Sequence, residues 1–218
     1  RDVLGSRGLG DVYKRQELQL PPEQVAMKYA NQCKPVIENI KPSRVPEKMQ
    51  LTGKQYGTGD GSFKYDGQKN NRQKLIIGMV AEMIVYEKLQ EDQNIENVKW
   101  VSRYAARVEP AYSGYNPHGT DGLGYDIEYT DRTGNKNFVE VKGKADNQNC
   151  FEITIPEIEK AKQEKKFYHI IFVTNTLNEE LRRIKYLGNL FMFEEGEDLL
   201  NNKRFSAVTK SYEIRFKE

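Results

Sequence analysis

Two carboxylates and a lysine lie in a short stretch that predicts a β-hairpin. Two segments of alternating apolar and polar residues flank the turn sequence Asp-Arg-Thr-Gly-Asn, a pattern typical of antiparallel strands. If the hairpin is centred on Thr133, Asp126 lies directly opposite Glu140. Lys142 then shares a face with Glu140, one pleat further along the strand. Opposed carboxylates repel each other across a strand pair, so the pattern predicts a compensating cation.

These residue types are suited to metal-assisted hydrolysis of a phosphodiester. Mg²⁺, for which Mn²⁺ is a possible substitute, prefers carboxylate oxygens and keeps part of its water shell, so Asp126 and Glu140 could bind it together. The Lys142 ammonium group would then orient or deprotonate the attacking water and stabilise developing charge. The alternative is that this alternation is ordinary solubilising sequence on the wet face of a hairpin.

Hydrophobic periodicity predicts the elements that position these residues. Residues 73–91 keep apolar side chains at helical spacing, and Glu82 lies on this helix. A second helix is expected from a Thr154 cap to about Lys166, with Glu157 as the other half of a capping box. Strands are expected at 98–103, 125–130, 137–143, 150–154, 167–176 and 206–216. The prediction is an α/β fold with a mixed β-sheet flanked by helices, in the order α-β-β-β-α-β.

Three domain segments are expected. Residues 1–16 show no structural pattern, and residues 6–16 can be encoded by the transposase adapter of tagmentation libraries, so we interpret them as translated adapter without structure. Residues 17–72 are expected to contain the remnant of one or two helices up to residue 40, followed by a polar linker. Residues 73–218 form the compact domain.

Charge and cysteine content bear on the partners and the cellular compartment that can be expected for this chain. The chain has 34 basic and 32 acidic residues. Removing the four basic and two acidic residues of the adapter leaves 30 of each, so general basicity does not argue for a nucleic-acid partner. The two cysteines are far apart and form no CxxC motif, which fits the reducing cytoplasm. No apolar run is long enough for a membrane span, so no membrane association is expected.

The order of motifs resembles a known family. Gly-Met-Val-Ala-Glu on the first helix is followed by Gly-Tyr-Asp-Ile, then Phe-Val-Glu-Val-Lys-Gly, then Phe-x-Ile-Thr-x-x-Glu, and then the apolar strand Tyr-His-Ile-Ile-Phe-Val. Over residues 73–218 this resembles the domain first described at the C-terminus of the plant NO VEIN protein. That domain is widespread in bacteria and often fused to helicases or ATPases. It is similar in turn to the PD-(D/E)xK restriction-endonuclease-like superfamily.

The resemblance implies a restriction-endonuclease-like core that cleaves DNA with Mg²⁺, as the C-terminal module of a larger restriction, defence or helicase-type protein. It implies Asp126, Glu140, Lys142 and Glu82 as the catalytic set, with Asp126, Glu140 and Glu82 as metal ligands. The literal Pro-Asp pair is replaced by Tyr125-Asp126. The alternative is a catalytically inactive module of the same fold that docks nucleic acid or protein.

Other polar residues give weaker signals. His118 and His169 have no partner at metal-ligand spacing, which favours a loop role for the first and a core role for the second. Loop residues that could stack or bond on nucleic acid, or instead pack over a sheet edge, are Tyr112, Tyr115 and Asn116. A run of lysines could be a solvated helix face or could hold phosphates, with the two alternatives left open: Lys160, Lys162, Lys165 and Lys166.

Overall fold

A computed structural model of the chain describes residues 20–30, 36–38, 67–108, 121–195 and 198. Several predictions concern residues outside this set. They are the adapter at 1–16, most of the linker, the last strand at 206–216, and His118, Tyr112, Tyr115 and Asn116.

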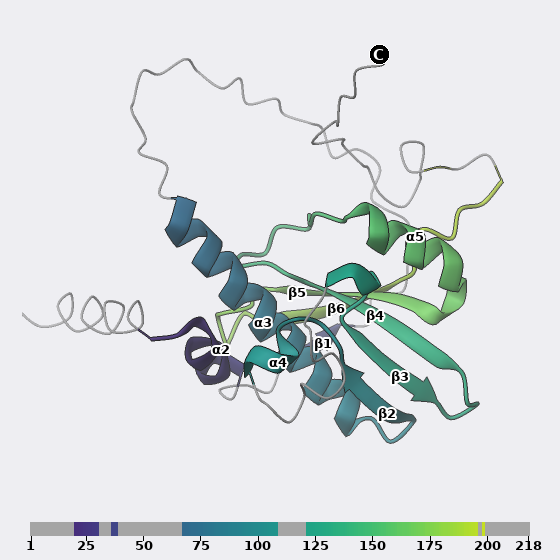
Figure 1. The fold of residues 1–218 in the computed structure, drawn as a ribbon, viewed down its shortest axis with the longest axis horizontal. Helices are drawn as coiled ribbons and strands as arrows, with labels where there is room; N and C mark the ends of the chain where they lie inside the picture. Colours follow the sequence, from purple (N-terminus) through teal and green to yellow (C-terminus); the bar gives the residue numbers. More distant parts are fainter. Residues whose placement is uncertain (1–19, 31–35, 39–66, 109–120, 196–197, 199–218) are drawn as a thin grey trace, which may run out of the picture.

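Helices and strands are mixed along the chain (Figure 1). In chain order they are α2 (Pro22–Ala30), β1 (Val36–Glu38), α3 (Gly67–Glu91), β2 (Ile95–Trp100), α4 (Ala105–Val108), β3 (Ile127–Asp131), β4 (Lys136–Gly143), α5 (Ile155–Glu164), β5 (Tyr168–Thr174) and β6 (Arg183–Gly188). The pairs β3–β4 and β5–β6 have no helix between their strands. Two short 3₁₀ turns, η2 (Asp121–Leu123) and η3 (Lys165–Phe167), precede β3 and β5. From α3 to β5, the one-turn α4 and the 3₁₀ turns aside, the order is the expected α-β-β-β-α-β.

The strands form one mixed sheet in the order β1-β6-β5-β4-β3-β2. The pairs β2–β3, β3–β4 and β5–β6 are antiparallel, whereas β4–β5 and β1–β6 are parallel. The parallel neighbours β4 and β5 need a crossover connection, and α5 lies within it. The prediction of an α/β fold with a mixed sheet and helices packed against it is confirmed.

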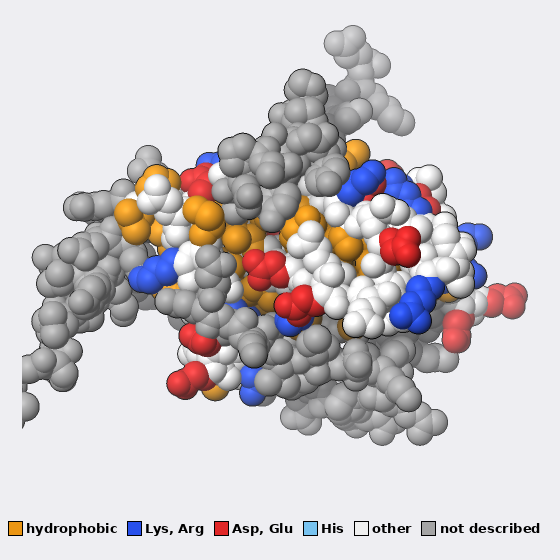
Figure 2. Space-filling model, turned by 90° about the horizontal axis from the view of Figure 1, so that it is seen from below, with side chains coloured by type: hydrophobic (Ala, Val, Ile, Leu, Met, Phe, Trp, Pro, Cys, Tyr) orange, Lys and Arg blue, Asp and Glu red, His pale blue; other side chains and the backbone are white. Residues whose placement is uncertain are grey.

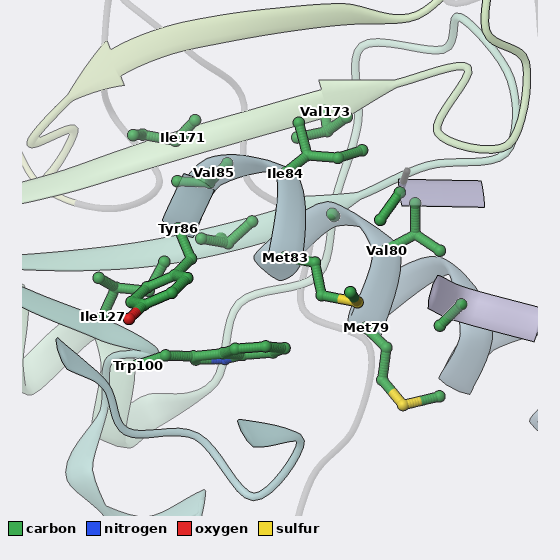
Figure 3. Packing of buried hydrophobic residues seen from close by; sticks show 14 of the residues in the cluster. Met79, Val80, Met83, Ile84, Val85, Tyr86, Trp100, Ile127, Ile171 and Val173 are labelled. Atoms are coloured by element: carbon green, nitrogen blue, oxygen red, sulfur yellow. The ribbon is translucent and has the colours of Figure 1, made fainter. Parts of the chain in front are cut away.

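Helices cover both faces of the sheet. Val139 and Val141 of β4 pack in a cluster with the buried side of α3, whereas Phe138, on the opposite face, packs in a second cluster with Ala161 of α5. Figure 3 shows α3 lying across the strands, with Val85 and Ile84 pointing toward Ile171 and Val173. The α3 cluster also contains Val25, Ala26 and Ala30 of α2, so α2 belongs to the same core.

The structure differs from the sequence prediction at four places. The segment 150–154 is not a strand, and its apolar residues Phe151 and Ile153 pack onto the α5 side of the sheet instead. Residues 36–38, expected to be helical, form β1 beside β6. The strand β6 itself was not expected. In addition, α3 begins at Gly67, inside the segment expected to be linker.

No helix in the described part of the chain is both long enough and apolar enough to span a membrane.

Candidate functional site

The hairpin has the register that the sequence predicts. Ile127 pairs with Val139, which places Asp126 opposite Glu140 just before β3 begins. The turn fixes this register locally: the Asp131 carboxylate accepts hydrogen bonds from the backbone N–H groups of Thr133 and Asn135, both at 2.9 Å. A side chain that binds backbone amides within its own turn specifies hairpin geometry without help from the rest of the fold.

Asp126 is held at the junction of three strands. Its N–H donates to the carbonyl of Val139 at 2.9 Å, and its own carbonyl accepts from the N–H of Val101, just after β2, at 2.8 Å. Its carboxylate oxygen Oδ2 accepts the backbone N–H of Val141 at 2.8 Å. The Asp126 carboxylate is therefore anchored to β4 beside Glu140.

Glycines allow the neighbouring elements to approach this junction. At Gly124 φ is +74°, and a Cβ there would lie 2.7 Å from the carbonyl oxygen of Pro156 in α5. At Gly143, which ends β4, a Cβ would lie 2.9 Å from the carbonyl oxygen of Ile77 in α3. Close packing of α5 and α3 on either side of the hairpin thus depends on the missing side chains.

Lys142 bridges two carboxylates on the α5 side of the sheet. Its Nζ lies 2.7 Å from Glu140 Oε1 and 2.7 Å from Glu157 Oε2. Glu140 is buried, with 4% exposure, and the side chains of Lys142 and Glu157 are each 15% exposed. The three residues form one nearly enclosed ion-pair network, defined here as the Lys142 network.

Glu157 has two roles, of which the sequence predicts one. Its Oε2 accepts the N–H of Thr154 at 3.0 Å, which confirms the expected capping interaction at the start of α5. The same oxygen accepts a hydrogen bond from Lys142. The second contact depends on α5 lying over β4, so spacing along the chain gives no signal of it.

Glu82 lies on the α3 side, toward Asp126. It is 4% exposed, and its Oε2 accepts the indole N–H of Trp100 at 2.8 Å and the hydroxyl of Ser102. Glu82 is the largest charged influence on the Asp126 carboxyl. Glu82 is therefore buried rather than turned to solvent, and its carboxylate is bound by Trp100 and Ser102.

Burial and neighbouring negative charge raise the pKa values of both acids at this junction. Burial, then the nearby Glu82 carboxylate, raise the pKa of Asp126 well above its usual value. Burial, then Asp126, raise the pKa of Glu140 in the same way. Burial opposes the charge on Lys142, but Glu140 and Glu157 outweigh it and raise the Lys142 pKa. Lys142 is thus a permanent cation near neutral pH, suited to stabilising negative charge rather than to removing a proton.

Some of the predicted site residues lie next to one another, and others do not. Asp126 and Glu140 are neighbours, and Lys142 contacts Glu140. Among the described residues, no three Asp, Glu, His or Cys side chains converge closely enough to hold a metal ion, so Glu82, Asp126 and Glu140 do not form a three-ligand shell in this arrangement. The oxygen donors still suit Mg²⁺, because two adjacent carboxylates with raised pKa values gain most from a hard cation.

The remaining polar candidates have partners outside the Lys142 network. His169 is in β5, where its Nε2 lies 2.9 Å from Asn137 Oδ1, in agreement with a core role. Lys160 pairs with Glu164 at 2.6 Å and lies over the Phe138 ring, 4.1 Å from its centroid. The other lysines of the run are exposed.

Comparison with known families matches the segment that carries these residues. Residues 81–187 match the family model described as Protein NO VEIN, C-terminal. The match extends from within α3 to β6 and includes all four predicted site residues and Glu157. No curated protein and no solved structure matches the chain. The match shows that residues 81–187 are similar to this family, and it carries no information on activity.

Proposed function

We propose that this domain is a Mg²⁺-dependent nuclease of the PD-(D/E)xK type that hydrolyses phosphodiester bonds in DNA. The observation that carries the proposal is the junction at which Asp126 lies opposite Glu140 with Lys142 beside it. Two acids and one lysine are thus brought together at the end of the hairpin that lies away from its turn. The α-β-β-β-α-β order and the NO VEIN C-terminal match support it.

Asp126 and Glu140 are the residues that would hold Mg²⁺. A bound divalent cation would supply charge neutralisation and a more acidic water. The backbone N–H of Val141 orients the Asp126 carboxylate. The negative charge of Glu82, on α3, raises the pKa of Asp126. In the reaction, a water oxygen bonds to phosphorus as the bond to the leaving oxygen breaks, and a proton passes to that oxygen.

Lys142 stabilises the negative charge that builds on the phosphate during this step. Its raised pKa keeps the ammonium group protonated, and the carboxylates of Glu140 and Glu157 hold it in place. Fixed charges aimed at the transition state are an effective source of rate enhancement, worth roughly 10² to 10³ for one donor.

One observation favours a second candidate function. The Lys142 network is already complete within the protein, with Lys142 bound to Glu140 and Glu157. Buried ion pairs of this kind also occur as purely structural features. The second candidate is therefore a catalytically inactive module of the same fold that docks nucleic acid or an associated ATPase.

Cleavage of supercoiled plasmid tests the proposal. We expect the wild-type chain to nick plasmid with Mg²⁺ or Mn²⁺ and not with EDTA, and Lys142→Ala to lose about 10² of the rate. The matched control is Lys162→Ala, on the exposed side of α5, which should cleave like the wild type. Equal cleavage by Lys142→Ala would exclude this site. A wild-type chain that binds DNA without cutting it would favour the docking module.

A further inference from the structure

Tyr168 begins β5 on the face of the sheet that α5 covers. It pairs with Phe138 of β4 and packs in the same cluster as Phe138 and Ala161 of α5. Its side chain is 0% exposed, so its hydroxyl group needs a hydrogen-bond partner inside the protein. Neither candidate function described above uses this residue.

The partner of the Tyr168 hydroxyl lies in the segment that leads to Asp126. The hydroxyl donates a hydrogen bond of 3.0 Å to the carbonyl oxygen of Gly124, which is buried and stands two residues before Asp126. This part of the chain precedes β3, which begins at Ile127. A side chain of β5 therefore holds the backbone where it enters the hairpin.

Packing against α5 restricts the same glycine. A Cβ at Gly124 would lie 2.7 Å from the carbonyl oxygen of Pro156 and 3.0 Å from the Cβ of Lys160, both in α5. With φ at +74°, Gly124 also has a left-handed backbone conformation that other residues rarely adopt. Gly124 is thus fixed by α5 and by the Tyr168 hydroxyl, and a single residue separates it from Asp126.

The charges near this hydroxyl belong to the candidate site. Figure 2 shows acidic and basic side chains interspersed over one face of the molecule, where salt and water screen them. Glu140, the largest charged influence on Tyr168, is by contrast only 4% exposed. Burial, then Glu140, Glu157 and Asp126, raise the pKa of Tyr168. The phenol therefore keeps its proton near neutral pH and remains a donor to Gly124.

We infer that Tyr168 is a positioning residue, whose hydroxyl fixes the segment before Asp126 and thereby holds the Asp126 carboxylate beside Glu140. The hydrogen bonds of Asp126 itself run to β4 and to the chain just after β2. The Tyr168 contact adds an anchor from β5, the strand on the other side of β4. Groups that orient a metal ligand from outside its coordination shell change metal affinity by about 10- to 100-fold. The effect on Mg²⁺ rests on the proposed function, whereas the position of Asp126 can be measured without metal.

The amide proton of Val141 reports on the Asp126 carboxylate, because its N–H donates to Asp126 Oδ2 at 2.8 Å. In ¹H–¹⁵N spectra of the full chain in EDTA, we expect Tyr168→Phe to shift this proton upfield, in the same direction as Asp126→Ala, which removes the acceptor. The matched control is Tyr186→Phe, which removes the hydrogen bond between the Tyr186 hydroxyl and His169 and should leave the Val141 resonance in place. An unchanged Val141 resonance in Tyr168→Phe, or the same shift in the control, would overturn the inference.

Isothermal titration calorimetry with Mg²⁺ measures the consequence for the metal site. We expect Tyr168→Phe to raise the Kd for Mg²⁺ about tenfold, and Tyr186→Phe to bind like the wild type. Para-aminophenylalanine at position 168 restores an N–H donor and should return the Kd towards the wild-type value. A Tyr168→Phe variant that melts at a lower temperature but keeps the wild-type Kd would show a purely structural role and overturn the inference. If Tyr168→Phe does not fold in buffer, trimethylamine N-oxide, which favours the compact state, allows the same two measurements.

The two measurements let the two proposals fail independently. A wild type that binds no Mg²⁺ would contradict the nuclease, and a Val141 shift in EDTA would then still support the role of Tyr168 in placing Asp126. A wild type that binds Mg²⁺ with the same Kd as Tyr168→Phe would support the metal site and contradict the role of Tyr168.

Discussion

Replacing Lys142 by Met should destabilise the folded protein more than any change of an exposed lysine. Met keeps most of the length of the side chain and removes its charge. Glu140, which is 4% exposed, would then lie next to Asp126 without its cation. A buried charge that loses its partner retains its desolvation penalty, and this is what makes the substitution costly.

The size of the effect follows from the distances. At 2.7 Å, with an effective dielectric constant of 20, each carboxylate attracts Lys142 by about 6 kcal/mol. Desolvation of several kcal/mol per ion opposes this attraction, and breaking such a pair leaves a net loss of about 3–5 kcal/mol. We expect Lys142→Met to lower the free energy of unfolding by about 3 kcal/mol.

Urea denaturation at neutral pH in EDTA measures this loss. The matched control is Lys88→Met, because Lys88 forms an exposed ion pair with Glu91 at i,i+3, and pairs of that kind contribute about 0–1 kcal/mol. The double change Lys142→Met with Glu140→Gln should recover part of the stability, because it removes the stranded carboxylate. A Lys142→Met variant as stable as Lys88→Met would refute the reasoning.

Two further outcomes concern stability. Burial lowers the pKa of His169 to about 4, so the unfolded chain binds a proton first as the pH falls. The contribution of His169 to the free energy of unfolding should therefore be complete above about pH 6.5 and fall by up to about 3 kcal/mol towards pH 4. In urea titrations at several pH values, His169→Gln should remove this part of the pH dependence. Gly143→Ala should cost about 1–3 kcal/mol, because the new Cβ would meet Ile77 and Ala81 of α3. Gly122→Ala, where nothing lies within 4 Å of the new Cβ, should cost far less in the same melts.

Local patterns predicted the hairpin well. Its turn is specified by contacts of Asp131 with its own neighbours, and its strands by alternation, so the opposition of Asp126 and Glu140 could be derived from spacing alone. The cap at Thr154 is local in the same sense. Features of this kind need no knowledge of the rest of the sheet.

Tertiary features were the ones that sequence reasoning missed. The alternation in 150–154 resembles a strand, but its apolar residues Phe151 and Ile153 pack in the cluster on the α5 side of the sheet without joining a strand. The contact of Glu157 with Lys142 depends on where α5 crosses the sheet. The hydrogen bonds of Glu82 depend on Trp100 and Ser102, which lie beyond the turn after α3. None of these partners is set by spacing.

The most direct test of the central claim is the Mg²⁺ response of the melting temperature. If Asp126 and Glu140 bind the ion, the wild type should have a higher melting temperature in Mg²⁺ than in EDTA. At a Mg²⁺ concentration of 100 times the Kd, binding should raise the free energy of unfolding by about 2.7 kcal/mol. Asp126→Asn with Glu140→Gln should show no gain. The control Glu159→Gln with Glu180→Gln, at two exposed positions, should respond like the wild type. An equal response in all three proteins, or no response in the wild type, would contradict the account.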